Sequence, residues 1–498
     1  MKKIFLYIIL MVAVCGFQSC SDFLEESSQD EVRPNTIEEL EQLLLGEGYI
    51  KGRDVFNYLE LLTDNVQNGY TSDPTQLDFL MQGAPVYKWD KDMYEQMAEQ
   101  NMIGHESWET LYKYIMGCNV VLDMIPKVDG TEDNLLNQKG QALALRAFYY
   151  FMLVNTYAEP YNKEGIDRET ALGVPLMLTC AIKDEFPHRA SISKVYQQIE
   201  KDLLEASDLM HKYGNNNINY KVTPLFTDLL LSRVYLFMEN WEKSAEYASN
   251  VIERKPQLMR LSDYYVVDEW FGTAVYNKEK GGVYNADSPE LIWGYSGRGS
   301  NDYFYHAPNF GTPGSPVFSA SDELKDLYEP GDIRTQAFYK EYFIDFMFGI
   351  KGLLCGEKGS PASLSNSQKG MRVAEVYLNR AEANIRMALE NGDASLKAKA
   401  LEDLNYLRSF RFDRYQEVEI SDDKKLLQFC LDERRREMAF EDMRWFDLRR
   451  LGMPEIKHII TYEENNPQEI VLKKGSNRYT LPISKKVLDQ NPALVQNS

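Results

Sequence analysis

The sequence is short of positive charge and lacks the compact motifs that identify common enzyme classes. Its 498 residues contain 76 acidic and 55 basic side chains, which gives a formal net charge of −21. Such an acidic chain is a poor partner for nucleic acid or an anionic membrane surface. The sequence contains no Walker loop, no HExxH motif, no GxSxG turn and no EF-hand loop. These absences favour a binding protein over an enzyme.

Cysteine and histidine are too few and too scattered to indicate a disulfide framework or a metal centre. The six cysteines are Cys15, Cys20, Cys118, Cys180, Cys355 and Cys430, with no CxxC spacing. The five histidines lie far apart in the sequence. We therefore expect no structural zinc, no disulfide scaffold and no cofactor.

Long apolar runs are also missing, apart from one at the N-terminus. The run from Ile4 to Val14 follows two lysines and is too short for an ordinary membrane helix. It leads to Phe17-Gln-Ser-Cys20, which resembles a lipobox with Phe where Leu is usual. We predict a lipoprotein signal peptide over residues 1–19, acylation of Cys20 and a tether over residues 20–36. The lipid would then be the only membrane anchor, whereas a simple cleaved signal peptide is the alternative.

Helical patterns dominate the rest of the chain. Apolar residues at helical spacing predict helices from about Ser107 to Ile125 and from about Leu135 to Tyr157, the second apolar nearly all round and hence buried. Ser193 is expected to cap a further amphipathic helix. These patterns indicate a mostly α-helical protein.

Two segments have the pattern of helix pairs. Residues 225–256 match a tetratricopeptide unit, in which Ser232 and Ser244 lie where two helices would touch and Pro256 closes the unit. A second helix pair is expected over 373–408. We therefore predict a curved scaffold of tetratricopeptide-like helix pairs, with a few short strands elsewhere.

The stretch Glu433–Leu451 is rich in charge and aromatic residues, and no Pro or Gly interrupts it before Gly452. One continuous helix would place acids and arginines three residues apart on the same face. The expected pairs are Arg434 with Glu437, Glu441 with Arg444, and Asp447 with Arg450. We interpret them as an internal salt-bridge clamp; catalytic carboxylates are the alternative.

This stretch resembles the C-terminal signature of the SusD/RagB family. Three other segments carry the same resemblance: the sequence around Arg146, residues 372–383, and the tail with Tyr479-Thr-Leu-Pro-Ile-Ser and Asn491–Asn497. The resemblance implies that residues 37–498 form a single SusD-like unit, with a helical scaffold at about 107–256 and 371–452 and a closing strand at Tyr479–Ser484.

Residues 257–370 form the least regular part of the chain and are expected to hold the ligand, because long loops in compact proteins usually have a function. A sugar presents an apolar face and a polar rim, which suits flat aromatics beside polar groups. The stacking candidates are Trp89, Trp270, Tyr303 and Tyr305, and the polar candidates are Asn301 and Asp302. The alternative for each aromatic is packing that anchors a loop.

The resemblance implies an outer-membrane lipoprotein, facing the cell exterior in the family's manner, that captures oligosaccharide without enzymatic activity and delivers it to a SusC-like TonB-dependent transporter. Two other functions stay open. One is binding of peptides instead of sugars. The other is a surface glycoside hydrolase, although no carboxylate pair can be singled out among 76 acids.

Overall fold

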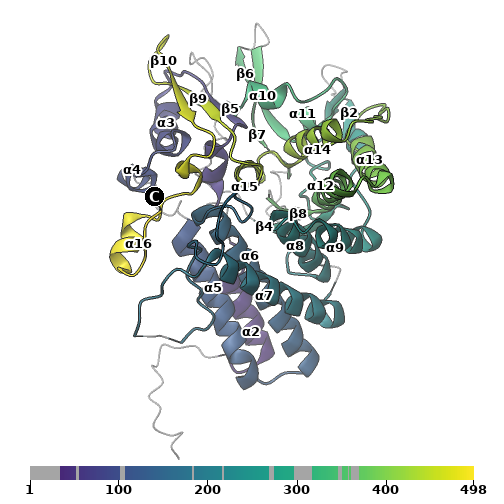
Figure 1. The fold of residues 1–498 in the computed structure, drawn as a ribbon. Helices are drawn as coiled ribbons and strands as arrows, with labels where there is room; N and C mark the ends of the chain where they lie inside the picture. The colour runs from purple at the N-terminus through teal and green to yellow at the C-terminus, as the bar shows by residue number, and fades with distance from the viewer. Residues whose placement is uncertain are drawn as a thin grey trace, which may run out of the picture.

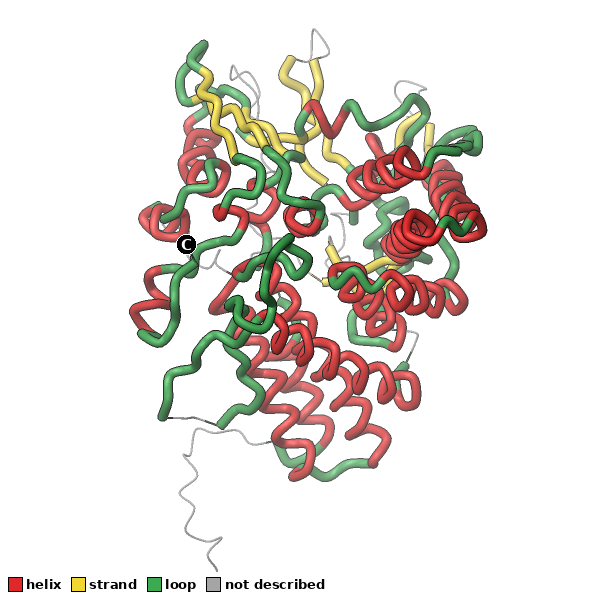
Figure 2. The backbone as a smooth tube through the Cα atoms, in the orientation of Figure 1, coloured by secondary structure: helices red, strands yellow, loops and turns green. Residues whose placement is uncertain are grey.

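Helices make up most of the fold, as the sequence predicts (Figure 2). The computed structural model describes residues 34–51, 55–100, 107–181, 184–215, 218–267, 274–295, 317–345, 350–356, 358–359 and 369–497. No helix in these ranges is long and apolar enough to cross a membrane.

The first part of the scaffold is a row of helices packed in chain order. It contains α2 (Ile37–Leu43), α5 (Ser107–Met124), α6 (Glu132–Tyr157), α7 (Ile192–Tyr213), α8 (Pro224–Phe237) and α9 (Trp241–Arg254). The predicted α5 and α6 are confirmed, and the second half of α6 is buried on every side. The cap predicted for α7 is wrong by two residues: Ser191 accepts from the Lys194 amide, whereas the Ser193 hydroxyl donates to Glu169.

The predicted tetratricopeptide contact is present between α8 and α9. The Ser232 hydroxyl donates to the Ser244 carbonyl at 3.0 Å, and the Ser244 hydroxyl donates to the Ser232 carbonyl at 2.9 Å. Small side chains at these two positions let the helix backbones approach closely, and each hydroxyl has a partner. The helices therefore cross where the sequence places them.

The scaffold continues through α12 (Val373–Asn391), α13 (Ala394–Ser409) and α14 (Asp423–Met438). Helix α12 packs on α9, α13 and α14 and so joins the two helix pairs. In Figure 1 the row starts with α2, α5, α6 and α7 at the bottom and turns through α8 and α9 to α12, α13 and α14 at the right. This arrangement is the predicted curved scaffold.

The strands are short and form five antiparallel pairs in the described ranges. The pairs are β1 (Val66–Asn68) with β5 (Phe318–Ala320), β2 (Tyr265–Val267) with β3 (Ala274–Tyr276), β4 (Leu291–Tyr295) with β8 (Lys369–Arg372), β6 (Tyr339–Asp345) with β7 (Ile350–Gly356), and β9 (Ile456–Thr461) with β10 (Pro467–Leu472). The closing strand expected at Tyr479–Ser484 is wrong, because this segment pairs with no strand in the described chain; instead the Leu481 amide donates to the Thr156 carbonyl of α6.

Short helical segments complete the fold. They are η2 (Leu44–Gly48), η3 (Asn57–Leu62), α3 (Pro74–Tyr87), α4 (Met93–Glu99), η4 (Ile125–Lys127), η5 (Leu261–Tyr264), α10 (Asp322–Lys325), α11 (Arg334–Ala337), α15 (Arg444–Arg450), η6 (Asn477–Tyr479) and α16 (Lys485–Gln490).

The signature stretch is not one helix. Helix α14 ends at Met438 and α15 begins at Arg444. Between them Phe440 and Asp442 have φ angles of 61° and 62°, in the left-handed region that interrupts a right-handed helix. The prediction of a continuous helix is therefore wrong. Because Phe440, Glu441 and Asp442 are all buried, the break lies inside the protein, where tertiary contacts override local propensity.

Candidate functional site

A buried cluster of charged residues joins the irregular region to the helical scaffold. This charge clamp consists of Glu290, Asp332, Arg334, Lys358, Arg372, Arg408, Arg411, Glu433, Glu437 and Glu441. Its centre is Glu437 on α14, whose carboxylate accepts from Arg334 at 3.0 Å, from Arg411 at 2.9 Å and from Arg372. All four of these side chains are fully buried. Each charge has a partner of opposite sign, as buried charges require.

The helix break changes which charges pair. Of the three expected local pairs, only Asp447 with Arg450 forms, at 2.8 Å. Arg434 instead donates to Asp447, and Glu441 accepts from Arg372 at 2.7 Å. Most clamp contacts therefore join residues distant in sequence, although Asp332 with Arg334 and Glu433 with Arg436 are local pairs.

The clamp's electrostatics agree with a structural role. Burial would raise the pKa of Glu433, but Arg334, Arg436 and Arg408 outweigh it and hold this pKa well below its usual range. Burial also opposes the charge of Glu437, and Arg411, Arg372 and Arg334 likewise lower its pKa. Carboxylates held ionised, fully buried and neutralised have no access to a substrate. The salt-bridge interpretation of the signature stretch therefore agrees with the structure.

Five of the six candidate ligand residues fall outside the described residues. These are Trp270, Asn301, Asp302, Tyr303 and Tyr305. The described chain on either side is ordered by pairing: Val267 and Ala274, which flank the Trp270 segment, are partners in the β2–β3 hairpin. The segment with the other four candidates follows β4, which ends at Tyr295, and precedes β5, which begins at Phe318.

Trp89 lies in the core and not on a binding surface. Its ring is 1% exposed, its indole N–H donates to the Leu62 carbonyl at 3.0 Å, and it stacks on His458 with 4.2 Å between ring centroids. Burial lowers the pKa of His458 to about 4. A ring with no open face cannot stack on a sugar, so the structure corrects this candidate to the loop-anchoring alternative.

Trp293 on β4 is also a packing residue. It is 1% exposed and its ring packs edge-on against Phe148 and Phe226. No group of three His, Cys, Asp or Glu side chains within the described ranges is arranged to hold a metal ion.

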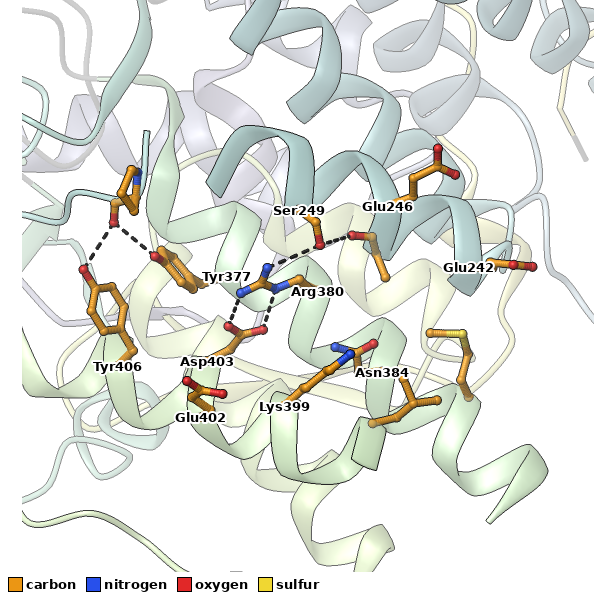
Figure 3. A pocket seen from close by; sticks show the side chains of 14 residues that line it. Glu242, Glu246, Ser249, Tyr377, Arg380, Asn384, Lys399, Glu402, Asp403 and Tyr406 are labelled. Atoms are coloured by element: carbon orange, nitrogen blue, oxygen red, sulfur yellow. Dashed lines mark hydrogen bonds and ion pairs between the residues drawn. The ribbon is translucent and has the colours of Figure 1, made fainter. Parts of the chain in front are cut away.

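A groove between α9, α12 and α13 is the feature that the sequence did not indicate. It has a volume of about 770 Å³ and is seen from close by in Figure 3. Arg380 on α12 donates to Asp403 on α13 at 2.6 and 2.9 Å and to the Ser249 hydroxyl on α9 at 3.3 Å. These contacts fix the guanidinium group in the groove. The helix pairs were predictable, but the packing of one pair on the other, which creates the groove, has no local sequence signal.

Comparison with known families identifies the fold and its relatives. Residues 22–236 match a SusD-like family model described as "Starch-binding associating with outer membrane". Residues 345–498 match the model of the SusD family. The chain belongs to the SusD/RagB family. The family resemblance of the signature stretch is thereby confirmed, and SusD-family proteins are binding proteins associated with the outer membrane.

Solved SusD structures share the fold over nearly the whole chain. A SusD superfamily protein from Bacteroides thetaiotaomicron is 22% identical, with a TM-score of 0.68, and the match covers 93% of this chain and 100% of that one. A SusD-like carbohydrate binding protein from Bacteroides vulgatus is 22% identical, with a TM-score of 0.66 and coverage of 92% and 97%. At such identities the likeness shows the fold alone. No curated protein matches the chain significantly.

Proposed function

We propose that this SusD-family protein captures oligosaccharide at the outer-membrane surface without cleaving it and delivers it to a SusC-like TonB-dependent transporter. The observation that carries the proposal is the match to two SusD family models, one in each half of the chain. The description of the first model names starch binding and association with the outer membrane.

The glycan site is proposed to lie in the irregular region, with Trp270, Tyr303 and Tyr305 as stacking residues and Asn301 and Asp302 as hydrogen-bonding groups. Aromatic rings contact the apolar faces of sugars, while amide and carboxylate groups pair with their hydroxyls. The charge clamp supports such a site, because it ties Arg334 and Lys358 of this region to helix α14 and Glu290 to Arg411, just beyond the end of α13. A rigid base reduces the ordering cost of binding.

Delivery is proposed to occur by a lid movement, in which the lipoprotein covers the transporter barrel and closes over bound ligand. A ligand can drive this change only if it binds the closed state more tightly than the open state. A complex that shows the same open and closed populations with and without glycan would contradict this part of the proposal.

Binding is tested on a soluble chain beginning after Cys20, with a glycan array followed by calorimetry of the positive sugars. A double variant, Trp270→Ala/Tyr303→Ala, is expected to lose binding. Phe186→Ala/Tyr220→Ala is the matched control, because it removes two aromatic rings that are 54% and 61% exposed elsewhere on the surface. The control is expected to bind like the parent protein, and the sugar should be recovered intact.

Each alternative predicts a different result in the same experiment. Cleaved ligand would support the glycoside hydrolase. Loss of binding in the control variant as well as in the test variant would contradict the proposed location of the site. Binding of peptides without binding of any sugar on the array would favour a peptide-binding member of the family.

A further inference from the structure

The groove between α9, α12 and α13 contains a buried polar side chain that the fold does not use. Asn384 on α12 is 4% exposed and is one of the side chains that line the groove (Figure 3). Its side chain has no hydrogen-bond partner among the described residues. The donor and acceptor of this amide are therefore available to a ligand or an ordered water in the groove. Because it carries both a donor and an acceptor, an amide matches a peptide backbone.

The mouth of the groove is acidic. Glu242 and Glu246 on α9 and Glu402 on α13 are exposed lining residues, and none forms a salt bridge within the described chain. The basic lining residues are Lys399 and Arg380, and Arg380 is neutralised by Asp403. The groove therefore has an excess of negative charge, which favours a cationic ligand.

The interior offers apolar contacts but little aromatic surface. Four of its lining residues are apolar and non-aromatic: Ala245, Pro256, Met387 and Leu396. Tyr377 is 4% exposed, and its hydroxyl and that of Tyr406 both donate to the Pro256 carbonyl. These hydrogen bonds hold the Tyr377 and Tyr406 rings in the wall of the groove. A sugar would require a more open aromatic face than Tyr377 provides.

We infer that this groove binds a short basic peptide segment of a partner protein, with its cationic side chains at the acidic mouth, an apolar side chain among the apolar walls and its backbone against the Asn384 amide. The volume of about 770 Å³ lies within the range of ligand sites in proteins, roughly 300–1,000 Å³. None of the proposed glycan residues lines this groove, and the two proposals are tested by different variants.

The test uses two fluorescent octapeptides on the soluble chain, one alternating Lys with Leu and one alternating Glu with Leu. Anisotropy is expected to show binding of the Lys peptide that weakens as salt rises, and no binding of the Glu peptide. Glu242→Gln/Glu246→Gln and Asn384→Ala should each weaken the Lys peptide by about fivefold to tenfold. Hydrogen exchange should show protection of residues 242–256 and 380–406 when the peptide binds.

A matched control is Glu463→Gln/Glu464→Gln, which removes the same charge from exposed positions beyond the end of β9. This control should change peptide affinity by less than about twofold. Equal weakening in the control and groove variants would overturn the inference, since it would show attraction to the acidic surface as a whole. Absence of peptide binding, or an oligosaccharide whose binding falls in the groove variants, would also overturn it.

Discussion

At the scale of single residues, Glu437 shows how strongly buried charges depend on one another. It is shared by Arg334, Arg372 and Arg411, and none of the four has any exposed surface. Glu437→Gln removes the negative charge and leaves the three guanidinium groups under-neutralised. We expect the free energy of unfolding to fall by about 3–5 kcal/mol, as when one partner of a buried pair is lost.

Urea unfolding followed by circular dichroism measures the effect of Glu437→Gln. Glu329→Gln is the matched control, because Glu329 pairs with Arg408 at 2.8 Å but its own side chain is 45% exposed. Removing an exposed partner should cost about 1 kcal/mol or less. Similar losses in both variants would show that burial does not set the energy of these pairs.

Glu60 makes stability depend on pH. Its burial, together with nearby Asp442, raises its pKa from 4.5 to about 7. The folded protein therefore binds a proton that the unfolded chain releases between these values, so stability is lost as pH rises from 4.5 towards 7. The Glu60→Gln variant does not take up this proton, because an amide does not titrate in this pH range. The stability of the wild type relative to the variant should fall by about 2 kcal/mol between pH 5 and 7.5, and parallel pH profiles would contradict the assignment.

At the scale of elements, close packing of α5 on η2 requires glycine at position 117. A Cβ atom added to Gly117 would lie 2.2 Å from the Glu47 carbonyl oxygen, a backbone atom that cannot turn aside. Gly117→Ala should push η2 from α5 and destabilise the protein by about 1–3 kcal/mol. Gly46→Ala, where nothing lies within 4 Å of the added atom, is the control. Thermal unfolding should show a lower Tm for Gly117→Ala only.

The elements also show what sequence reasoning can reach. Helices α5 and α6 and the crossing at Ser232 and Ser244 were predictable, because each depends on periodicity or spacing within a short segment. The break at Phe440 and Asp442 was not, since no Pro or Gly marks it. Because the break redirects Glu441 to Arg372, the ion-pair partners were mostly wrong although the clamp itself was expected.

For the candidate site, the sequence predicted the types of residue that would contact a ligand but not which of them are exposed. Burial of Trp89 depends on its stacking with His458, which lies far along the chain, and the groove at Asn384 depends on the packing of α9 against α12. Neither contact leaves a local pattern. Residue type and loop context therefore suggest ligand chemistry but do not distinguish an exposed ring from a buried one.

At the scale of the whole molecule, the proposed delivery mechanism depends on how the protein is attached to the membrane. The sequence proposes acylation of Cys20, after a signal peptide that ends in Phe17-Gln-Ser. An acyl group on the first mature residue would leave the folded unit free to move over a transporter while holding it at the surface. Cys20→Ala should therefore abolish incorporation of labelled palmitate and release the protein from the outer-membrane fraction, because little else would hold so acidic a chain on the membrane.

Cys15→Ala is the matched control for this experiment, since it removes the other cysteine of the leader and should leave labelling and membrane fractionation unchanged. Protease added to intact cells then reports orientation, and digestion of the wild-type protein is expected if it faces outward. Labelling that persists in Cys20→Ala but disappears in Cys15→Ala would show that Cys15, and not Cys20, is acylated. Absence of palmitate labelling in the wild-type protein would favour a simple cleaved signal peptide and would remove the lipid tether from the proposed delivery mechanism.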